Sequence, residues 1–183
     1  MARESYNASF NEAALEHLDA LYGYAMTLTR EPSEAEDLLQ ETYLRAVKAF
    51  GQLAPGSKLK AWLFVIMRNA WLNELRRRRN RPGIVEFDPD DDNVLLWPDA
   101  LMDDPHLIYL RKLEREEIRE AIESLPRQSR EIVVLRDIEV FSYQEIATML
   151  VCPAGTVMSR LSRARGRLRR LLSSPKSLTA KAV

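Results

Sequence analysis

The chain has 183 residues, of which 46% are hydrophobic and 30% charged, and its 27 basic and 27 acidic side chains cancel. This composition fits a soluble protein of one medium domain or two small ones, and the scarcity of glycine favours an all-α fold. No apolar run approaches the roughly 18 residues that a membrane span needs, and the N-terminus lacks the apolar core of a signal peptide. We therefore expect a cytoplasmic protein without membrane insertion. A lone cysteine, Cys152, excludes an internal disulfide.

The first strong helix signal follows the apolar segment 12–29. Ser33 precedes Glu36 by three residues, the pattern of a capping box, and predicts a helix from Ser33 to Gly51. The side chains predicted to face the core are Leu38, Leu39, Tyr43, Ala46, Val47 and Phe50. The opposite side carries Asp37, Gln40, Glu41 and Arg45.

A second long helix is predicted over residues 57–79. Its expected core stripe is Leu59, Trp62, Leu63, Ile66 and Ala70. Asn69, Asn73 and Arg76 recur at steps of four and three on another face. Aromatic residues beside basic ones suggest that Trp62 and Phe64 stack on unpaired bases, although both fit the core equally well.

Charge is segregated along the rest of the chain. Residues 76–81 read RRRRNR, residues 160–170 read RLSRARGRLRR, and residues 86–104 carry eight acidic side chains and no basic one. An acidic, proline-containing block cannot bury enough apolar surface to fold alone, so residues 81–105 are predicted to form a flexible acidic linker. It separates helical modules predicted over 8–80 and 106–173, and residues 174–183 are predicted to form a flexible tail.

The second module begins with a predicted helix over 106–124, whose apolar residues Leu107, Leu110, Leu113, Ile118 and Ile122 share one face. A short helix is predicted after Pro126. Ser142 and Glu145 form another capping box, which predicts a helix from residue 142 or 143 to about Leu150.

The last helix is predicted to begin at Pro153, with Cys152 as its N-cap. Two short helices with a brief turn between them, the second one basic, indicate a helix-turn-helix, although the turn lacks the usual glycine. At 100° per residue, the core side comprises Val157, Leu161, Ala164 and Leu168. The opposite side comprises Ser159, Ser162, Arg163 and Gly166, which suits contacts to base edges and phosphates.

These motifs together resemble a bacterial extracytoplasmic-function (ECF) sigma factor. The residues that carry the resemblance are DLLQE at 37–41, AWLF at 61–64 with Asn69, ESLP at 123–126, SYQEIATML at 142–150 and GTVMSRLSRAR at 155–165. The resemblance covers residues 8–173. It implies that the first module is sigma region 2, which binds core RNA polymerase and recognises and melts the minus-ten element. The second module is then sigma region 4, which reads the minus-thirty-five element.

The resemblance also implies site residues. The polymerase contacts are Asp37, Gln40, Glu41 and Arg45. The predicted minus-ten contacts are Trp62, Phe64, Asn69, Asn73, Arg76 and Arg77. The minus-thirty-five contacts are Thr156, Met158, Ser159, Arg160, Ser162, Arg163 and Arg167. Met158 departs from the family pattern, in which a basic residue is common there, and so does Val65. Family members are commonly held inactive by an anti-sigma factor, so such a partner is expected too.

Other functions are less consistent with the sequence. His17 and His106 are isolated, the aspartates at 90–92 lack the glycine of a calcium loop, and no nucleophile motif is present, so we expect no enzyme, metal or cofactor. A decoy that sequesters an anti-sigma protein would lack the basic recognition face. An ordinary helix-turn-helix repressor leaves the first eighty residues unexplained.

Overall fold

The computed structural model describes residues 10, 12–54, 56–80 and 116–173, and all regular secondary structure in these ranges is helical. The chain divides into two compact units. This agrees with the predicted all-α fold of two small helical modules. The predicted acidic linker, 81–105, and the tail, 174–183, lie outside the described residues. Among the helices in the described ranges, none combines the length and the apolar content that a membrane crossing needs.

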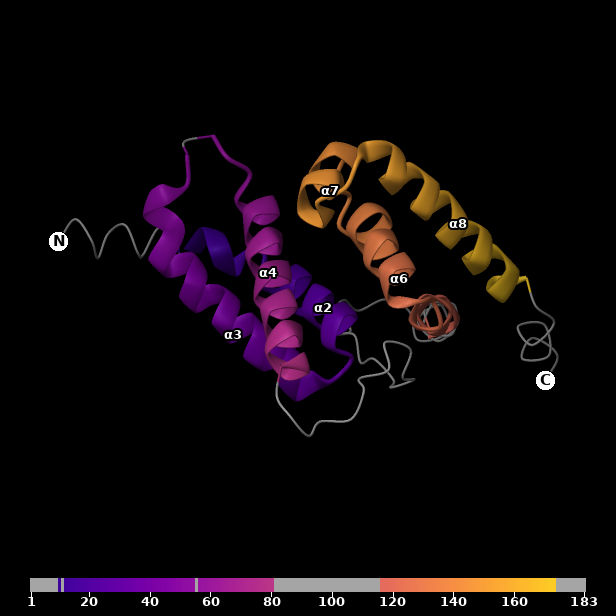
Figure 1. Cartoon of the computed structure of the whole chain (residues 1–183), viewed down its shortest axis with the longest axis horizontal. Helices are drawn as coiled ribbons and strands as arrows, with labels where there is room; N and C mark the ends of the chain where they lie inside the picture. Colours follow the sequence, from indigo (N-terminus) through magenta and orange to yellow (C-terminus); the bar gives the residue numbers. More distant parts are fainter. Residues whose placement is uncertain (1–9, 11, 55, 81–115, 174–183) are drawn as a thin grey trace, which may run out of the picture. The chain divides into compact units, whose positions relative to one another are not determined.

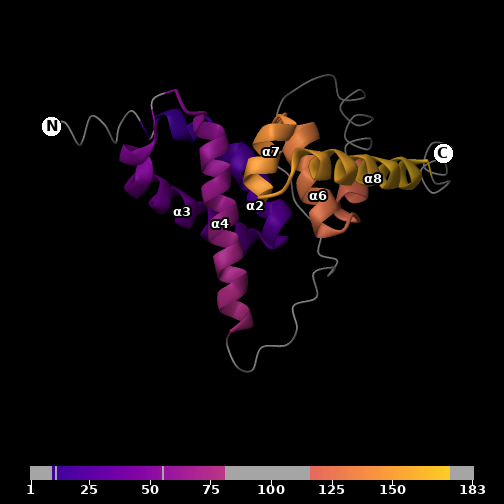
Figure 2. The same ribbon diagram turned by 45° about the horizontal axis from the view of Figure 1, so that its top comes forward.

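The first unit is a bundle of three helices, α2 (Leu18–Thr29), α3 (Pro32–Ala49) and α4 (Leu59–Arg79), with a short 3-10 turn, η1 (Phe50–Gln52), after α3. Each of the three helices packs against the other two, as Figures 1 and 2 show. Residues 12–15 are also helical, and the Tyr43 hydroxyl of α3 donates a 2.6 Å hydrogen bond to the Ala14 carbonyl. Burial raises the pKa of Tyr43.

The buried side of α4 differs from the predicted stripe. Leu63 and Ala70 are buried as expected, but Leu59, Trp62 and Ile66 are only partly covered. The remaining buried residues of α4 are Phe64, Met67 and Trp71. Apolar residues lie almost all the way round the first half of this helix, so periodicity does not fix which side turns inward. Packing against both α2 and α3 selects the side that carries Phe64, Met67 and Trp71.

The start of α3 is also corrected. Its N-cap is Glu31, with an extended backbone, and Pro32 occupies the first helical position. Proline restricts the residue before it, Glu31, to extended conformations, so the helix cannot begin earlier. Proline also has no backbone N–H, and the N–H of a first helical residue has no partner within the helix, so Pro32 fits that position. The Ser33 hydroxyl therefore lies inside the first turn and donates to the Glu31 carboxylate at 3.4 Å. The predicted capping box at Ser33 and Glu36 is wrong.

The second unit comprises helical residues 116–123, α6 (Arg127–Val133), the π-helical turn η2 (Val134–Ile138), α7 (Tyr143–Leu150) and α8 (Ala154–Leu172). α6 packs directly on α8. The core side chains of this unit include Leu125, Ile132, Leu135, Ile146 and Leu161. Ile118, predicted to face the core, is 48% exposed, because Ala121 and Leu125 take the inward positions of this segment.

The capping box before α7 is confirmed. The Ser142 backbone N–H donates to Glu145 Oε2 at 2.8 Å, and the Glu145 N–H donates to Ser142 Oγ at 3.3 Å. The flanking Phe141 and Ile146 are both buried, as a hydrophobic staple requires. α7 therefore begins at Tyr143 and ends at Leu150, as predicted.

The turn between α7 and α8 is a Schellman motif. The Cys152 N–H donates to the Ala147 carbonyl and the Val151 N–H to the Thr148 carbonyl, at 3.0 and 3.3 Å. Val151, with φ of 52°, occupies the left-handed position that glycine usually takes. Pro153 then has an extended ψ of 146° and is the N-cap of α8 rather than its first helical residue. The predicted cap at Cys152 is displaced by one residue, because the proline ring fixes φ and leaves ψ free.

Candidate polymerase and nucleic-acid interfaces

α3 presents one polar face away from the core. Asp37, Gln40 and Glu41 are exposed and Arg45 is partly covered, so all four predicted polymerase contacts are accessible. The Arg45 Nε lies 2.7 Å from Glu41 Oε1, four residues earlier. Both side chains are more than 40% exposed, so this pair adds little stability and leaves the charges available to a partner.

Two apolar residues lie on the same exposed face of α3. Leu44 is 57% exposed and Val47 is 39% exposed. At 100° per residue, Leu44 lies between Gln40 and Asp37 around the helix axis, and further along the helix than both. The apolar pattern does not single out Leu44, and its prediction that Val47 faces the core is wrong. In the structure, the inward stripe of α3 consists of Ala35, Leu38, Thr42 and Ala46, so these two residues lie outside it.

The amide and arginine row on α4 is accessible. Asn69, Asn73, Arg76 and Arg77 are all exposed. Arg76 Nη1 donates to Asn73 Oδ1 at 2.9 Å, and Arg77 Nη2 lies 2.7 Å from Glu74 Oε2. All four side chains are therefore accessible, which their predicted role as minus-ten contacts requires.

The two aromatic residues predicted to stack on bases have different environments. Phe64 is completely buried and stacks on Tyr24, with ring centroids 4.8 Å apart and planes inclined by 20°. It forms part of the core, so its assignment to the DNA contacts is wrong: its ring faces are covered by protein. Trp62 is only partly covered, so part of its surface is accessible. Its ring centroid lies 6.5 Å from that of Phe50.

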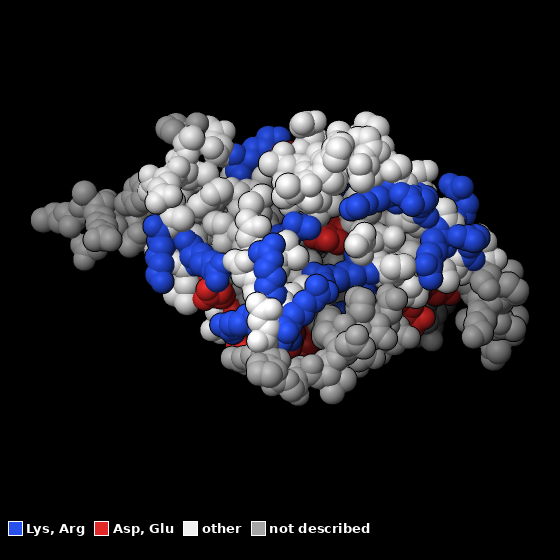
Figure 3. Space-filling view, in the orientation of Figure 1, with Lys and Arg blue, Asp and Glu red and all other residues white. Residues whose placement is uncertain are grey.

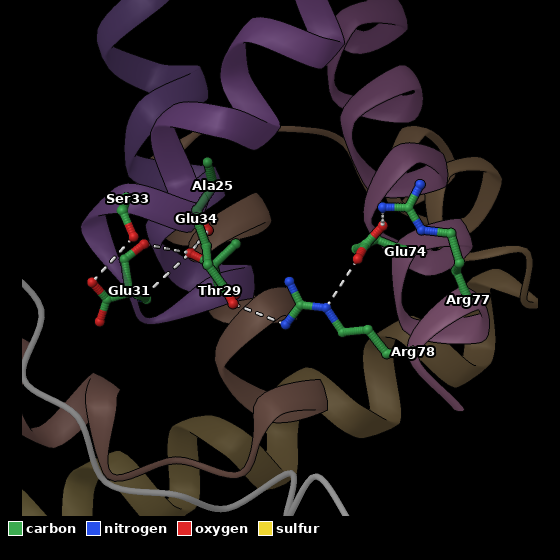
Figure 4. A network of polar contacts seen from close by, with 8 residues as sticks. All are labelled: Ala25, Thr29, Glu31, Ser33, Glu34, Glu74, Arg77 and Arg78. Carbon is green, nitrogen blue, oxygen red and sulfur yellow. Dashed lines mark hydrogen bonds and ion pairs between the residues drawn. The ribbon is translucent and has the colours of Figure 1, made fainter. Parts of the chain in front are cut away.

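An ionic network joins the end of α4 to the start of α3. Arg78 Nη1 lies 2.8 Å from Glu34 Oε1, and Arg78 Nε lies 3.1 Å from Glu74 Oε1 (Figure 4). The guanidinium also lies over the Trp71 ring, 5.6 Å from its centroid. Burial on its own would lower the pKa of Arg78, but the hydrogen bonds to Glu34 and Glu74 outweigh burial and raise it.

A groove of ≈ 390 Å³ runs between α3 and α4. One wall carries Asp37, Glu41 and Arg45, and the other carries Asn73 and Arg77. Its remaining lining residues are Glu34, Leu38, Ala70, Trp71, Glu74 and Arg78. Three of the four residues predicted for polymerase therefore lie across one groove from two of those predicted for DNA.

In the second unit, α8 has one buried and one exposed side. Val157, Leu161 and Ala164 are buried and Leu168 is partly covered, as predicted. Ser159, Ser162, Arg163 and Arg167 are exposed, whereas Thr156 and Arg160 are partly covered. Figure 3 shows basic side chains gathered over α8 and over the C-terminal half of α4. The accessible side of α8 combines hydroxyls with guanidinium groups, which can donate hydrogen bonds to base edges and phosphates.

Not every arginine of α8 lies on that side. Arg165 forms a bidentate ion pair with Asp137 of η2, in which Arg165 Nε donates to Asp137 Oδ2 at 3.1 Å and Nη2 to Oδ1. The hydrogen bonds from Arg165 to Asp137 raise the pKa of Arg165. Met158 is 51% exposed on the same flank of the helix, where Tyr143, Arg165 and Arg169 also border a shallow hollow.

Comparison with known proteins gives one family for both units. Residues 14–81 match the family Sigma-70 region 2, and residues 115–168 match Sigma-70, region 4. The ECF RNA polymerase sigma factor EcfG of Rhodopseudomonas palustris is 35% identical, over 90% of this chain and 85% of the relative. The RNA polymerase sigma-H factor of Pseudomonas aeruginosa is 31% identical, over 86% of this chain and 82% of the relative.

A solved structure is similar across most of its length. It is the co-crystal structure of the sigma factor RpoE in complex with the anti-sigma factor NepR from Bartonella quintana. It has a TM-score of 0.70 and 31% identity, and the match covers 90% of this chain and 96% of that one. With two sigma-70 regions in their expected order and ECF relatives matched over most of their length, this chain belongs to the ECF sigma factors of the sigma-70 family.

Proposed function

We propose that this chain binds core RNA polymerase and directs it to promoters through two separate DNA contacts, one to the minus-ten element and one to the minus-thirty-five element. The observation that carries the proposal is the groove of the first unit, where Asp37, Glu41 and Arg45 of α3 lie opposite Asn73 and Arg77 of α4. A helix-turn-helix protein that bound DNA alone would have no use for this arrangement. The chain contributes no chemistry of its own and acts in the cytoplasm, where polymerase is found.

The polymerase contact is assigned to the exposed face of α3, through Asp37, Gln40, Glu41 and Arg45, with Leu44 at its centre. A polar rim around an exposed apolar residue is the usual composition of a protein interface. The minus-ten contact is assigned to the adjacent side of α4 and is made by Trp62, Asn69, Asn73, Arg76 and Arg77. The amides can pair with base edges, while the arginines neutralise phosphates.

The minus-thirty-five contact is assigned to α8, entering the major groove by its N-terminal half. Its contacts are Thr156, Met158, Ser159, Arg160, Ser162, Arg163 and Arg167. Hydroxyl and guanidinium groups at the first exposed positions read bases, and the later arginines hold the backbone. Because Met158 offers an apolar side chain in place of a cation, we assign it contact with a thymine methyl group rather than with phosphate.

An anti-sigma factor is proposed as the regulatory partner, because a sigma factor that is 31% identical to this chain was solved in complex with one. Pull-down of tagged full-length chain from unstressed cells is expected to recover an inhibitor that suppresses transcription when added back. If no inhibitory partner is recovered and the protein is fully active in unstressed cells, this part of the proposal fails.

Run-off transcription tests the main proposal. Purified core polymerase is given a library of promoter fragments with and without the chain. Transcripts that depend on the chain and share two spaced motifs are the expected result. Binding to polymerase without any transcript would instead indicate a decoy for an anti-sigma factor. No binding to polymerase would refute the assignment of α3.

A further inference from the structure

We propose that Arg78 is a positioning residue, which ties the DNA-binding side of α4 to the polymerase-binding side of α3 through Glu34. The inference rests on the proposed function and deepens it. Arg78 lies in a run of four arginines that looks uniformly basic in the sequence. Its neighbours Arg76 and Arg77 are assigned to DNA, whereas Arg78 is assigned to the protein itself.

The structure separates Arg78 from its neighbours. The Arg77 side chain is 67% exposed, whereas that of Arg78 is 31% exposed. A 100° step per residue turns Arg78 toward α3 and leaves Arg76, Arg77 and Arg79 exposed. Arg78 alone among the four lies over the Trp71 ring and reaches a carboxylate on another helix. Its charge is therefore satisfied within the unit.

The chemistry of this site requires arginine. Arg78 uses two different nitrogens, one for Glu34 on α3 and one for Glu74 on its own helix, while its planar group lies over Trp71 (Figure 4). Lysine has a single ammonium group and no planar face, so it cannot reproduce both bonds together with the ring contact. A simple phosphate contact, in contrast, would accept lysine.

The location of the Glu34–Arg78 pair gives it a mechanical role. Glu34 is one turn before Asp37, the first predicted polymerase contact of α3, and Arg78 is within two turns of Asn73, Arg76 and Arg77. All of them except Arg76 line one groove. When polymerase holds α3, this pair fixes the orientation in which α4 meets the minus-ten element. Loss of the pair should impair promoter opening while leaving attachment to polymerase unchanged.

The test uses the full-length chain with core polymerase and a promoter from the run-off experiment. Strand opening is followed with a fluorescent base in the minus-ten element, and polymerase affinity is measured separately. Arg78→Gln is expected to leave polymerase affinity unchanged and to reduce opening by about 2- to 30-fold, the range for residues that couple two sites. Glu34→Gln should lower opening too, and the double variant should be no worse than Arg78→Gln. Arg78→Lys should not restore opening.

Arg77→Gln is the matched control. Removal of a phosphate contact lowers the slope of log affinity against log salt by about 0.9, so Arg77→Gln should change the slope and Arg78→Gln should not. A lower slope in Arg78→Gln, with rescue by lysine, would show that Arg78 contacts DNA and overturn the inference. Additive losses of opening from Glu34→Gln and Arg78→Gln would also overturn the inference. An opening defect that disappears under conditions in which the Arg78→Gln variant is fully folded would overturn it too. Failure of the wild-type chain to support transcription would refute the proposed function instead.

Discussion

At the level of single residues, the turn of the helix-turn-helix carries an unusual strain. Val151 has a φ of 52° and is 84% exposed. A left-handed conformation brings the Cβ too close to the backbone, at a cost of about 1–2 kcal/mol, and a β-branched side chain tolerates it poorly. Nothing is gained from burial in return. In the absence of a glycine in this turn, Val151 therefore adopts the left-handed conformation that glycine usually takes.

Val151→Gly should stabilise the second unit. The substitution removes the steric cost of about 1–2 kcal/mol and adds about 0.5–1 kcal/mol of backbone entropy loss, so the free energy of unfolding should rise by up to about 1.5 kcal/mol. Hydrogen exchange of the α8 amides measures this change. Val151→Ala retains the Cβ and serves as the control, with little expected change. Slower exchange in Val151→Ala than in Val151→Gly would contradict the explanation.

Residue roles are predictable where they depend on local helical geometry. The exposed serines and arginines of α8 lie where a 100° step places them. Ion pairs between distant positions are not predictable in this way, since Arg165 and Asp137 are 28 residues apart. The prediction that Phe64 contacts DNA fails for the same reason: only the packing of Tyr24 against it reveals that it is buried.

At the level of helices, the two similar capping patterns have different outcomes. Ser142 accepts the Glu145 N–H, whereas Ser33 lies inside α3 behind Pro32. Ser142→Ala should lower the free energy of unfolding by about 1 kcal/mol, as loss of an N-cap does. Ser33→Ala should change it by less than about 0.5 kcal/mol. Chemical denaturation of both variants checks this difference, and equal losses would refute the assignment of the caps.

The exposed face of α3 gives a second prediction for an element. Leu44→Ala should weaken polymerase binding by roughly tenfold, about 1.4 kcal/mol, because truncation costs most affinity at well-packed positions near the centre of an interface. Stability should be unchanged, since the side chain is 57% exposed in the free protein. Direct binding to core polymerase measures the effect. Leu15→Ala, a residue 61% exposed outside α3, is the control, and equal losses in both variants would show that Leu44 has no special role.

Helix positions follow from the sequence better than helix faces do. α7 and α8 begin within one residue of their predicted starts, because capping residues and proline act locally. The predicted buried side of α4 is partly wrong, because an almost continuous apolar surface leaves the choice to α2 and α3. Leu44 and Val47 are apolar residues of α3 that lie outside its buried stripe. Once that stripe is known, these two residues indicate an exposed surface for a partner.

For the whole molecule, a net charge of zero does not reveal that basic side chains are concentrated on particular surfaces. The chain carries 27 basic and 27 acidic side chains, yet its arginines gather at the end of α4 and along α8. The two-module division, the helix-turn-helix and the family are all predictable, because they follow from motif order. Each unit offers few phosphate contacts, so either one alone should bind DNA weakly. Polymerase would hold both units on one promoter and raise their effective concentration.

The most direct test of this account is a comparison of DNA binding with and without core polymerase. Affinities for a promoter fragment and a scrambled fragment are measured by fluorescence anisotropy across a range of salt concentrations. The chain alone should bind both fragments weakly and equally, and polymerase with the chain should prefer the promoter by about a thousandfold or more. If the chain alone prefers the promoter as strongly as the complex does, it is an independent DNA-binding protein and the account is wrong.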